Sequence, residues 1–469
     1  MKGGPDTELS EDARALARAL LDAGHDAVVV GGAVRDSLMG RGVTDVDLVT
    51  DATPDQIRSL THGVDWARST YAVGERFGTL GVVLSDGGVV EVSRYREPAL
   101  IGTTTAERFA ADAELRDFTV DAMGFDLSTG ELLDPLDGRI DIHDMLLRAP
   151  EDPAARFAED PLRVLRAARL VAELGFDVEA ATFEAVAGAA LGLEDVAVER
   201  IRDELTKLLV SSHPGRGLDQ ASRSGALAVV LPEVAALDGV EQPTFHDLDA
   251  LAHTIQTVQN VAPTPVLRWA ALLHDVGKGP TRSVEADGRI RFFGHSKVGA
   301  VLAEAICRRL RLSKADTAAI VHLVQEHMRL GELDVDNDRA VDRAVRKLDA
   351  RQRGADTGQP LVSAEQVLEL TMADFEATAH RDEAEPVRRR LAEAIAASRQ
   401  RGTETAVTSP LSGDELMKAL NINEGEGVGL AKKAIEAAIL NGTLNVDDRA
   451  RALDVARNAL LRRPRGESS

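Results

Sequence analysis

The pattern of hydrophobic and polar positions changes along the chain and predicts two kinds of structure. A polar start leads into "EDARALARALLDAG", whose apolar residues recur at helical spacing until Gly24. Residues 27–148 carry short β-branched runs, "AVVVGG", "TDVDLVT", "GTLGVVLSD" and "GVVEVSRYR", broken by glycine and aspartate. Such runs predict strands, and "DATPDQIRSL" between them predicts a capped helix. We therefore expect a mixed α/β domain over this range.

Beyond Asp160 the apolar spacing is helical, as in "PLRVLRAARLVAELGF" and "VAVERIRDELTKLLV". The exceptions are a hairpin-like segment at 281–295 and two expected loops at 351–364 and 399–410. The pattern predicts an α+β chain with five parts. These are an N-terminal helix (1–26), an α/β head (27–148), a helical neck and body (149–245), a second helical domain (246–400) and a helical tail (401–469).

Composition narrows the class of protein. A chain of 469 residues is too long for one core, and with 44% hydrophobic but 3% aromatic residues the cores must be aliphatic. The single cysteine, Cys307, argues against a disulfide framework and fits a reducing, cytoplasmic location. We expect neither a secretory signal nor a membrane span, since no apolar run is long enough. The net charge of −22 argues against a protein that coats nucleic acid, but it leaves room for a local basic patch.

Two aspartates one residue apart, Asp45 and Asp47, lie in an otherwise apolar run. On a strand, alternate side chains point to one face, so these carboxylates would converge and repel unless a cation lay between them. A hard divalent ion such as Mg²⁺ suits such ligands, and Glu91, between valines on another expected strand, is a third candidate. Taken alone, the pair could equally be a turn residue and a solvent-facing residue.

The glycines upstream strengthen the first interpretation. "VVVGG" followed by "AVRDSLMG" reads as strand, tight turn and helix. Gly31 and Gly32 would let the backbone approach a ligand closely, and Arg35 adds a fixed positive charge. A nucleoside triphosphate held beside metal-binding carboxylates indicates phosphoryl or nucleotidyl transfer.

"GGAVRDSLMGRGVTDVDLVT" resembles the signature of the class II tRNA nucleotidyltransferases and bacterial poly(A) polymerases, within the polymerase-β superfamily. The resemblance continues in family order through "VGERFGTLGVV", "VEVSRYRE", "LRDFTVDAMGFD", "DPLDGRIDI" and "AEDPLRVLRAARLVAELGF". It implies a polymerase-β-like head on an all-α neck and body. It also implies Mg²⁺-dependent, template-independent addition of CCA to the 3′ end of tRNA from CTP and ATP.

The resemblance assigns nucleotide selection to Asp160 and Arg163, with Glu159 in support. Cytosine and adenine both carry an exocyclic amine beside a ring-nitrogen acceptor, so a carboxylate and an arginine together favour them over uracil and guanine. Both residues would lie on one side of a helix. The alternative is that Asp160-Pro161 is only a helix start and Arg163 a surface residue.

Further nucleotide-binding residues implied by the resemblance are Arg116, Asp117 and Arg166. The chain departs from the family pattern at Leu115, usually arginine, and Asp121, usually asparagine. The segment 97–114, which corresponds to a flexible loop that in the family assists the switch from C to A addition, is shorter and lacks the usual basic stretch. A CC-adding enzyme and a poly(A) polymerase therefore remain alternatives.

A second constellation follows the HD-domain pattern, with His253, "HDVGK" at His274 and Asp275, and a downstream Asp374. Imidazole and carboxylate ligands suit a divalent transition metal or Mg²⁺, which would activate water for phosphoester hydrolysis. His295 is an alternative ligand. This unit is either a scaffold or a phosphohydrolase, and in the second case the head would serve as a nucleotide- or RNA-binding module. The sequence leaves the oligomeric state open.

Overall fold

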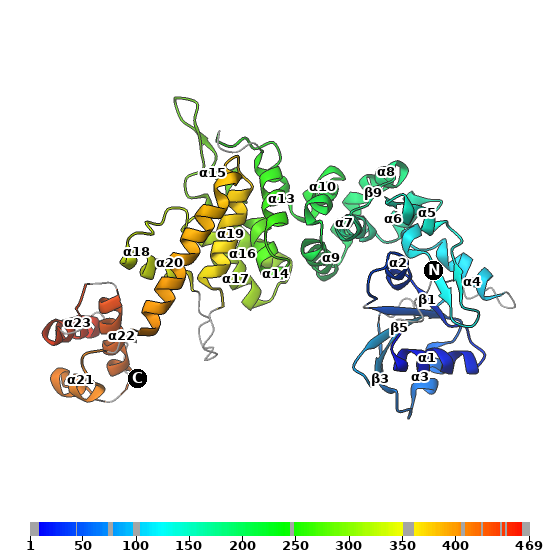
Figure 1. The fold of residues 1–469 in the computed structure, drawn as a ribbon, viewed down its shortest axis with the longest axis horizontal. Coiled ribbons are helices and arrows are strands. Elements are labelled where there is room, and N and C mark those ends of the chain that lie inside the picture. Colours follow the sequence, from blue (N-terminus) through cyan, green and yellow to red (C-terminus); the bar gives the residue numbers. More distant parts are fainter. Residues whose placement is uncertain are drawn as a thin grey trace. The chain divides into compact units, whose positions relative to one another are not determined.

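The computed structural model describes residues 9–43, 45–73, 78–96, 104–243, 248–349, 361–404, 409–423, 425–440, 443–445 and 448–461. The chain forms two compact units, residues 1–236 with 309–311 and residues 237–308 with 312–469. Figure 1 labels the elements of both. Strands are concentrated in the first unit and helices dominate the second, so the predicted α+β class is confirmed. Among the described residues, no helix is both long and apolar enough to cross a membrane.

The head contains a sheet with strand order β3-β4-β5-β2-β1-β6-β7. Strands β2 and β5 run parallel, and the other neighbouring strands run antiparallel. The strands are β1 (Val28–Val30), β2 (Val46–Thr50), β3 (Ala67–Ala72), β4 (Leu80–Leu84), β5 (Val89–Arg94), β6 (Gly124–Asp126) and β7 (Glu131–Leu133).

Helices cover one face of the sheet and part of the other (Figure 1). On the first face, α1 (Glu11–Asp22) and α3 (Pro54–Thr61) pack aliphatic side chains against the strands. The helix α2 (Gly32–Leu38) follows β1 directly and packs against β1 and β2. The predicted cap of α3 is present, since Thr53 and Gln56 form a capping box. On the second face, α4 (Thr105–Ala113) buries Phe109 against strand residues. The uncovered part of this second face is where the candidate site lies.

Short elements lead from the head into the body, which is built from helices as the apolar spacing predicted. Gly217 lets two of them approach closely, because a Cβ there would lie 2.6 Å from the carbonyl oxygen of Ala168. The elements are η2 (Thr119–Asp121), α5 (Gly138–His143), β8 (Leu146–Leu147), α6 (Pro153–Glu159), α7 (Arg163–Leu174), β9 (Asp177–Val178), α8 (Ala180–Ala189), η3 (Ala190–Asp195), α9 (Val198–Val210), α10 (Pro214–Arg223), α11 (Ala226–Val230) and α12 (Pro232–Ala235).

The second unit is helical except for the predicted hairpin, which forms as β10 and β11. Its last three helices share a core of their own around Leu416 and Ile435. The elements are α13 (Ala250–Asn260), α14 (Pro265–Leu273), α15 (Lys278–Thr281), β10 (Ser283–Val284), β11 (Ile290–Arg291), α16 (His295–Arg309), α17 (Lys314–Glu326), α18 (Asp338–Leu348), α19 (Ala364–Glu376), η4 (Arg381–Glu383), α20 (Ala384–Glu404), α21 (Gly413–Leu420), α22 (Glu426–Leu440) and α23 (Arg449–Leu461).

Parts of two segments that the sequence suggested as loops, 399–410 and 97–114, are helical, while residues 405–408 lie outside the described part of the chain. Residues 399–404 continue α20, where Arg399 pairs with Asp349 and Glu365 from other elements. These long-range ion pairs stabilise a turn of helix that the local sequence does not favour. In the segment 97–114, residues 105–113 form α4, while residues 97–103 lie outside the described part of the chain, as do residues 351–360 of the other expected loop.

Candidate active site and metal cluster

Two of the predicted acids lie side by side on the sheet. Asp47 on β2 is paired directly with Glu91 on the parallel strand β5, and with Val30 on β1. Directly paired residues point to the same face of a sheet, so both carboxylates emerge together. Strand β2 begins at Val46, so Asp45 lies just before it rather than on it. Burial and the charge of Glu91 raise the pKa of Asp47 to about 6.

The predicted glycine turn lies next to these acids. Gly31 has a φ of 69°, which favours glycine, and α2 begins at the following residue. A Cβ on Gly31 would lie 3.9 Å from Asp47 Oδ2 and 3.8 Å from Arg116 Nη1. The turn, one acid and one arginine therefore border the same space. Gly32 starts α2 and faces the guanidinium of Arg35.

Arg35 is buried, and its guanidinium is held by two carboxylates. Nη1 lies 2.5 Å from Asp121 Oδ1, and Nε donates to Asp36 Oδ1 at 2.9 Å. Despite burial, which acts in the opposite direction, these carboxylates raise the pKa of Arg35. Asp121, the departure from the family pattern, thus joins η2 to α2. The charge of Arg35 is already partly balanced within the protein.

Arg116 and Asp117, predicted to bind nucleotide, both make ion pairs inside the first unit. Arg116 donates from Nε and Nη2 to Asp112 Oδ2 at 3.0 and 2.9 Å. Asp117 accepts from Arg166 Nε at 2.6 Å. Burial would raise the pKa of Asp117, but the guanidinium of Arg166 holds it well below the usual range. These pairs fix the orientation of three predicted nucleotide-binding residues.

The expected placement of Asp160 and Arg163 on one helix is wrong. Pro161 disfavours helix in the residue before it, and Asp160 is extended, so α6 ends at Glu159 and α7 begins at Arg163. The Asp160 carboxylate accepts from Arg200 Nη2 at 2.8 Å. Arg163 Nη1 donates to Glu159 Oε2 at 3.1 Å. The predicted reader residues therefore flank a break between two helices, and each is held by an ion pair.

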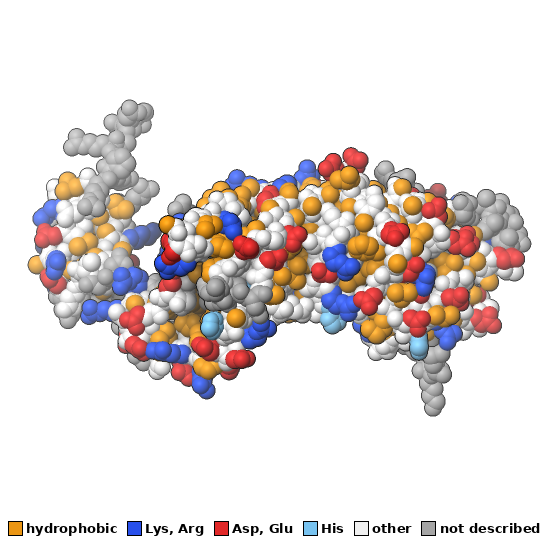
Figure 2. Space-filling view, turned by 90° about the horizontal axis from the view of Figure 1, so that it is seen from above, with side chains coloured by type: hydrophobic (Ala, Val, Ile, Leu, Met, Phe, Trp, Pro, Cys, Tyr) orange, Lys and Arg blue, Asp and Glu red, His pale blue; other side chains and the backbone are white. Residues whose placement is uncertain are grey.

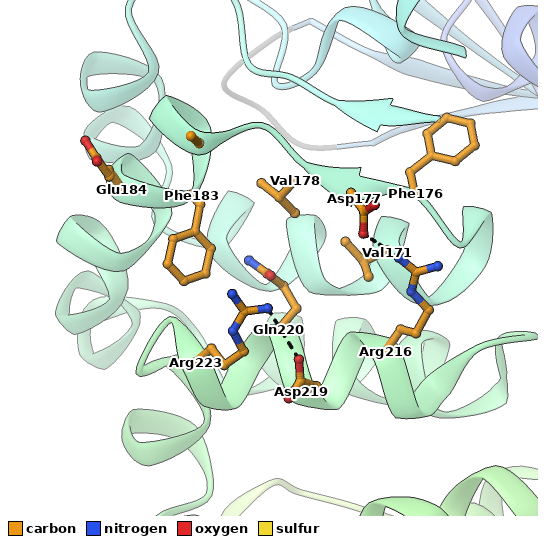
Figure 3. Close-up of a pocket in the computed structure, with 11 residues that line it drawn as sticks. Val171, Phe176, Asp177, Val178, Phe183, Glu184, Arg216, Asp219, Gln220 and Arg223 are labelled. Atoms are coloured by element: carbon orange, nitrogen blue, oxygen red, sulfur yellow. Dashed lines mark hydrogen bonds and ion pairs between the residues drawn. The ribbon is translucent and has the colours of Figure 1, made fainter. Parts of the chain in front are cut away.

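A pocket of about 500 Å³ lies in the body, between β9, α8 and α10 (Figure 3). Two ion pairs line it, Arg216 with Asp177 at 2.6 Å and Arg223 with Asp219 at 3.5 Å. Phe183 packs under the guanidinium of Arg223. None of the predicted nucleotide-binding residues lines this pocket, so it is separate from the acids of the head. On the face shown in Figure 2, acidic and basic side chains are interspersed.

The second unit brings together every predicted HD residue. His253 on α13, His274 after α14 and Asp374 on α19 form one compact group of possible metal ligands. Asp275, next to His274, belongs to a second, adjacent group with His295 and His327. His253 Nε2 lies 2.9 Å from Asp374 Oδ1, and His274 Nε2 lies 3.0 Å from Asp275 Oδ2. The nitrogen and oxygen of this second pair are buried, and the ammonium of Lys278 lies 2.6 Å from the same Asp275 oxygen. Burial would raise the pKa of Asp275, but His274 and Lys278 hold it well below the usual range.

Sequence reasoning missed one member of this cluster, His327, at the end of α17. Its Nε2 lies 3.3 Å from Nε2 of His295, the residue predicted as an alternative ligand, and His295 Nε2 lies 3.5 Å from Asp275 Oδ1. Burial lowers the pKa of His327 to about 4. In the sequence, His327 appears only as a histidine in "VQEHM", and its position does not fit the HD-domain pattern of histidines and aspartates. In the described part of the chain, both compact groups of metal-ligating atoms belong to this unit.

The hydrogen bonds of the four histidines define which nitrogen faces the centre. Each Nδ1 lies 2.7 to 3.2 Å from a backbone carbonyl, which can only accept a hydrogen bond. Each neutral imidazole therefore carries its proton on Nδ1 and presents the lone pair of Nε2. The Nε2 lone pair of His253 faces a carboxylate oxygen at 2.9 Å, and those of His295 and His327 face each other at 3.3 Å. Such contacts are repulsive unless a cation or a proton lies between the two atoms. The donor set thus fits a divalent metal.

Three family profiles match successive parts of the chain. They are the poly A polymerase head domain over residues 27–148, the "Probable RNA and SrmB-binding site of polymerase A" over residues 175–237, and the HD domain over residues 252–354. The head domain carries the paired acids Asp47 and Glu91, and an HD domain follows it in the chain. These features define the protein as a nucleotidyltransferase.

Two relatives match along nearly the whole chain. An A-adding tRNA nucleotidyltransferase of Deinococcus radiodurans is 34% identical over 91% of this chain and 94% of its own. A CC-adding tRNA nucleotidyltransferase of Thermus thermophilus is 32% identical over 91% and 92%. The solved CCA-adding enzyme of Bacillus stearothermophilus in complex with CTP shares the fold, with a TM-score of 0.63 and 23% identity over 96% of this chain and 99% of its own. The chain belongs to the family of tRNA nucleotidyltransferases and poly(A) polymerases.

Proposed function

We propose that this protein adds nucleotides from CTP and ATP to the 3′ end of tRNA without a nucleic-acid template, completing the CCA terminus. The observation that carries the proposal is the direct pairing of Asp47 with Glu91 beside the turn at Gly31 and the guanidinium of Arg116. Carboxylates and an arginine around one space suit a reaction in which a triphosphate loses pyrophosphate.

Asp45, Asp47 and Glu91 would hold Mg²⁺, an ion that prefers carboxylate oxygens. The raised pKa of Asp47 supports this, since a carboxylate held beside a second one is stabilised by a cation. When bound, the metal lowers the pKa of the attacking 3′-hydroxyl and neutralises the leaving pyrophosphate.

The turn residues and their neighbours would bind the rest of the nucleotide. Gly31 and Gly32 offer backbone that can approach the triphosphate closely, and Arg35 supplies charge from the first turn of α2. Arg116 borders the same space. Asp117, through its ion pair with Arg166, orients the segment between the head and α7.

For base selection, we propose that Asp160 accepts from the exocyclic amine of cytosine or adenine and Arg163 donates to the adjacent ring nitrogen. Glu159 holds Arg163 through an ion pair. Arg200, which now binds Asp160, has half its surface open to solvent and would have to share that carboxylate with the base.

An extension assay on tRNA determines how many nucleotides the protein adds and which ones. The shortened segment 97–114 favours a CC-adding enzyme, and a poly(A) polymerase is the other alternative. We would incubate tRNA that lacks its last three nucleotides with CTP alone and then with CTP and ATP. Addition of three nucleotides supports the proposal, a stop after two identifies a CC-adding enzyme, and failure to extend overturns the assignment. Repeated AMP addition to unrelated RNA would identify a poly(A) polymerase.

A second function is supported by the HD cluster. We propose that His253, His274, Asp275 and Asp374 bind a divalent transition metal and that the unit hydrolyses phosphoesters, with Lys278 near the phosphate. Two close approaches carry this proposal: His253 Nε2 lies 2.9 Å from Asp374 Oδ1, and His274 Nε2 lies 3.0 Å from Asp275 Oδ2. The runner-up is a unit that binds metal but serves only as scaffold. Release of phosphate from a 2′- or 3′-phosphorylated RNA end separates the two.

We also propose the five-part division with boundaries after residues 26, 148, 245 and 400, and a cytoplasmic location, where the tRNA substrate would be found. The matched ranges of the head, the RNA-binding segment and the HD domain support the three middle parts.

A further inference from the structure

An exposed tyrosine lies in the same row of the sheet as the paired acids. Tyr71 on β3 is paired with Gly81 on β4, Gly81 with Glu91 on β5, and Glu91 with Asp47 on β2. Directly paired residues share a face, so Tyr71 and the two acids project from the same side of the sheet. Neighbouring strands are about 4.8 Å apart, so one strand separates the tyrosine from Glu91.

Gly81 lets the aromatic ring lie across the sheet. A Cβ on Gly81 would be 2.5 Å from Tyr71 Cζ and 2.8 Å from its hydroxyl oxygen, so the end of the ring occupies the place of a side chain. Tyr71 nevertheless keeps 48% of its surface exposed. Its hydroxyl makes no hydrogen bond to any residue that the structure describes. The ring therefore covers β4 and leaves aromatic surface open beside Glu91.

The order of side chains across the strands suggests on which side of Asp47 and Glu91 the triphosphate and the 3′-hydroxyl of tRNA bind. The turn at Gly31 and Arg116 lie on the β1 side of Asp47, and the proposed function puts the triphosphate there. In phosphoryl transfer the attacking and leaving oxygens lie roughly in line on opposite sides of phosphorus. With the triphosphate on the β1 side, this geometry favours an approach of the 3′-hydroxyl from the β5 side of the acids. Tyr71 is the aromatic group on that side.

We propose that Tyr71, whose ring lies over Gly81, binds the terminal base of the RNA strand that receives the nucleotide. This proposal rests on the proposed function. A ring fixed against a sheet offers a flat surface on which any base can stack, which suits an enzyme whose acceptor end changes after each addition. Tyr71 would thus be a positioning residue: it contacts the acceptor strand, and the acids act on the hydroxyl.

The test is steady-state addition of CMP to tRNA lacking its last three nucleotides, with Tyr71→Ala, Tyr71→Leu and Tyr71→Phe. We expect Tyr71→Ala to raise the KM for tRNA by about 5- to 150-fold, the range for loss of one base–aromatic stack, with the KM for CTP nearly unchanged. Tyr71→Phe should retain the affinity for tRNA, because the phenyl ring stacks equally well. Phe293→Ala, which removes a 73% exposed aromatic from the second unit, is the control.

A role in packing alone predicts a different result, because the aromatic ring also covers a glycine in the sheet. In that case Tyr71→Leu would restore activity as well as Tyr71→Phe, and kcat and both KM values would change together. Gly81→Ala tests the geometry independently: its Cβ would displace the ring, so it should raise the KM for tRNA as Tyr71→Ala does.

Two outcomes separate this proposal from the proposed function. If the wild-type protein extends tRNA and Tyr71→Ala leaves its KM for tRNA unchanged, the stacking site is wrong and the enzymatic function stands. If the wild-type protein does not extend tRNA at all, both are overturned.

Discussion

Asp47 and Glu91 occupy directly paired positions on the parallel strands β2 and β5, and their carboxylates share one face of the head sheet. The acids are adjacent because two strands far apart in sequence were brought into this register. Burial of Asp47 and its proximity to Glu91 raise the pKa of Asp47 to about 6, so the ionised pair is unfavourable without a cation. The pairing of Asp47 with Glu91 therefore indicates a site that binds a cation rather than an interaction that stabilises the fold.

We predict that Asp47→Asn lowers kcat for nucleotide addition by about 10³-fold, since loss of a metal ligand removes several kcal/mol of transition-state stabilisation. The same change should raise the melting temperature of the metal-free protein at pH 7.5. An acid whose folded pKa is raised destabilises the fold once it ionises, so this gain should appear as the pH rises from about 4 to about 6. Asp55→Asn, at an exposed position on α3, should change neither quantity.

The ion pair of Asp117 with Arg166 should be visible in the pH dependence of stability. Asp117→Asn should lower the free energy of unfolding by about 1–3 kcal/mol near neutral pH, as expected for a hydrogen bond to a charged group. Because the folded pKa of Asp117 lies below its unfolded value, the wild-type carboxylate stabilises the protein above about pH 4 and loses this effect as the pH falls further. Urea unfolding of both proteins should therefore converge in acid, and a constant difference would contradict the prediction.

His327 should contribute to metal binding. His327→Ala should reduce the Mn²⁺ or Ni²⁺ retained by the purified protein, measured by elemental analysis, by at least about 10-fold under dilute conditions, because losing even a residue that only orients a metal ligand costs about that much affinity. His322→Ala is the matched control, since His322 lies on the same helix and bonds the backbone of Leu348 outside the cluster. CMP addition to tRNA should be unaffected by both changes. Equal metal content in the two variants would exclude His327 as a ligand.

Asp160 should act on the choice of base rather than on the rate of chemistry. Asp160→Ala should reduce the preference for CTP over UTP by about 5- to 150-fold, the value of one good base contact of about 1–3 kcal/mol. Arg200→Ala frees the same carboxylate and should preserve the preference. Asp203→Ala, at an exposed position on α9, is the control. An unchanged ratio of kcat/KM values for CTP and UTP in Asp160→Ala would remove Asp160 from base selection.

Local patterns were sufficient for some of these features. The strand, turn and helix around Gly31 follow from the five valine and glycine positions 28–32 and from Arg35, and the capping box at Thr53 is readable in "DATPDQIRSL". The HD cluster was predicted from one dipeptide and two distant residues, and the structure brings all of them together.

Other features depend on partners that the local sequence does not name. Arg35 meets Asp121 across 86 positions, so its burial could not be inferred from the motif around it. The extension of α20 depends on Asp349 and Glu365, which lie on other elements. At Asp160-Pro161 the sequence allowed either one continuous helix face or a new helix start, and the structure agrees with the second: the Asp160 carboxylate accepts from the backbone N–H of Leu162, just before α7.

The backbone carbonyls behind the four histidines have one more consequence. Because they hold each ring in the ligating tautomer before any ion arrives, the cluster needs little rearrangement to bind one. The affinity of nitrogen and oxygen ligands for divalent metals rises from Mn²⁺ to Cu²⁺ in almost any site. Which metal this cluster binds therefore depends on which metals are available in the cell. Protein produced in media enriched in manganese or in nickel should then carry different ions on an unchanged scaffold.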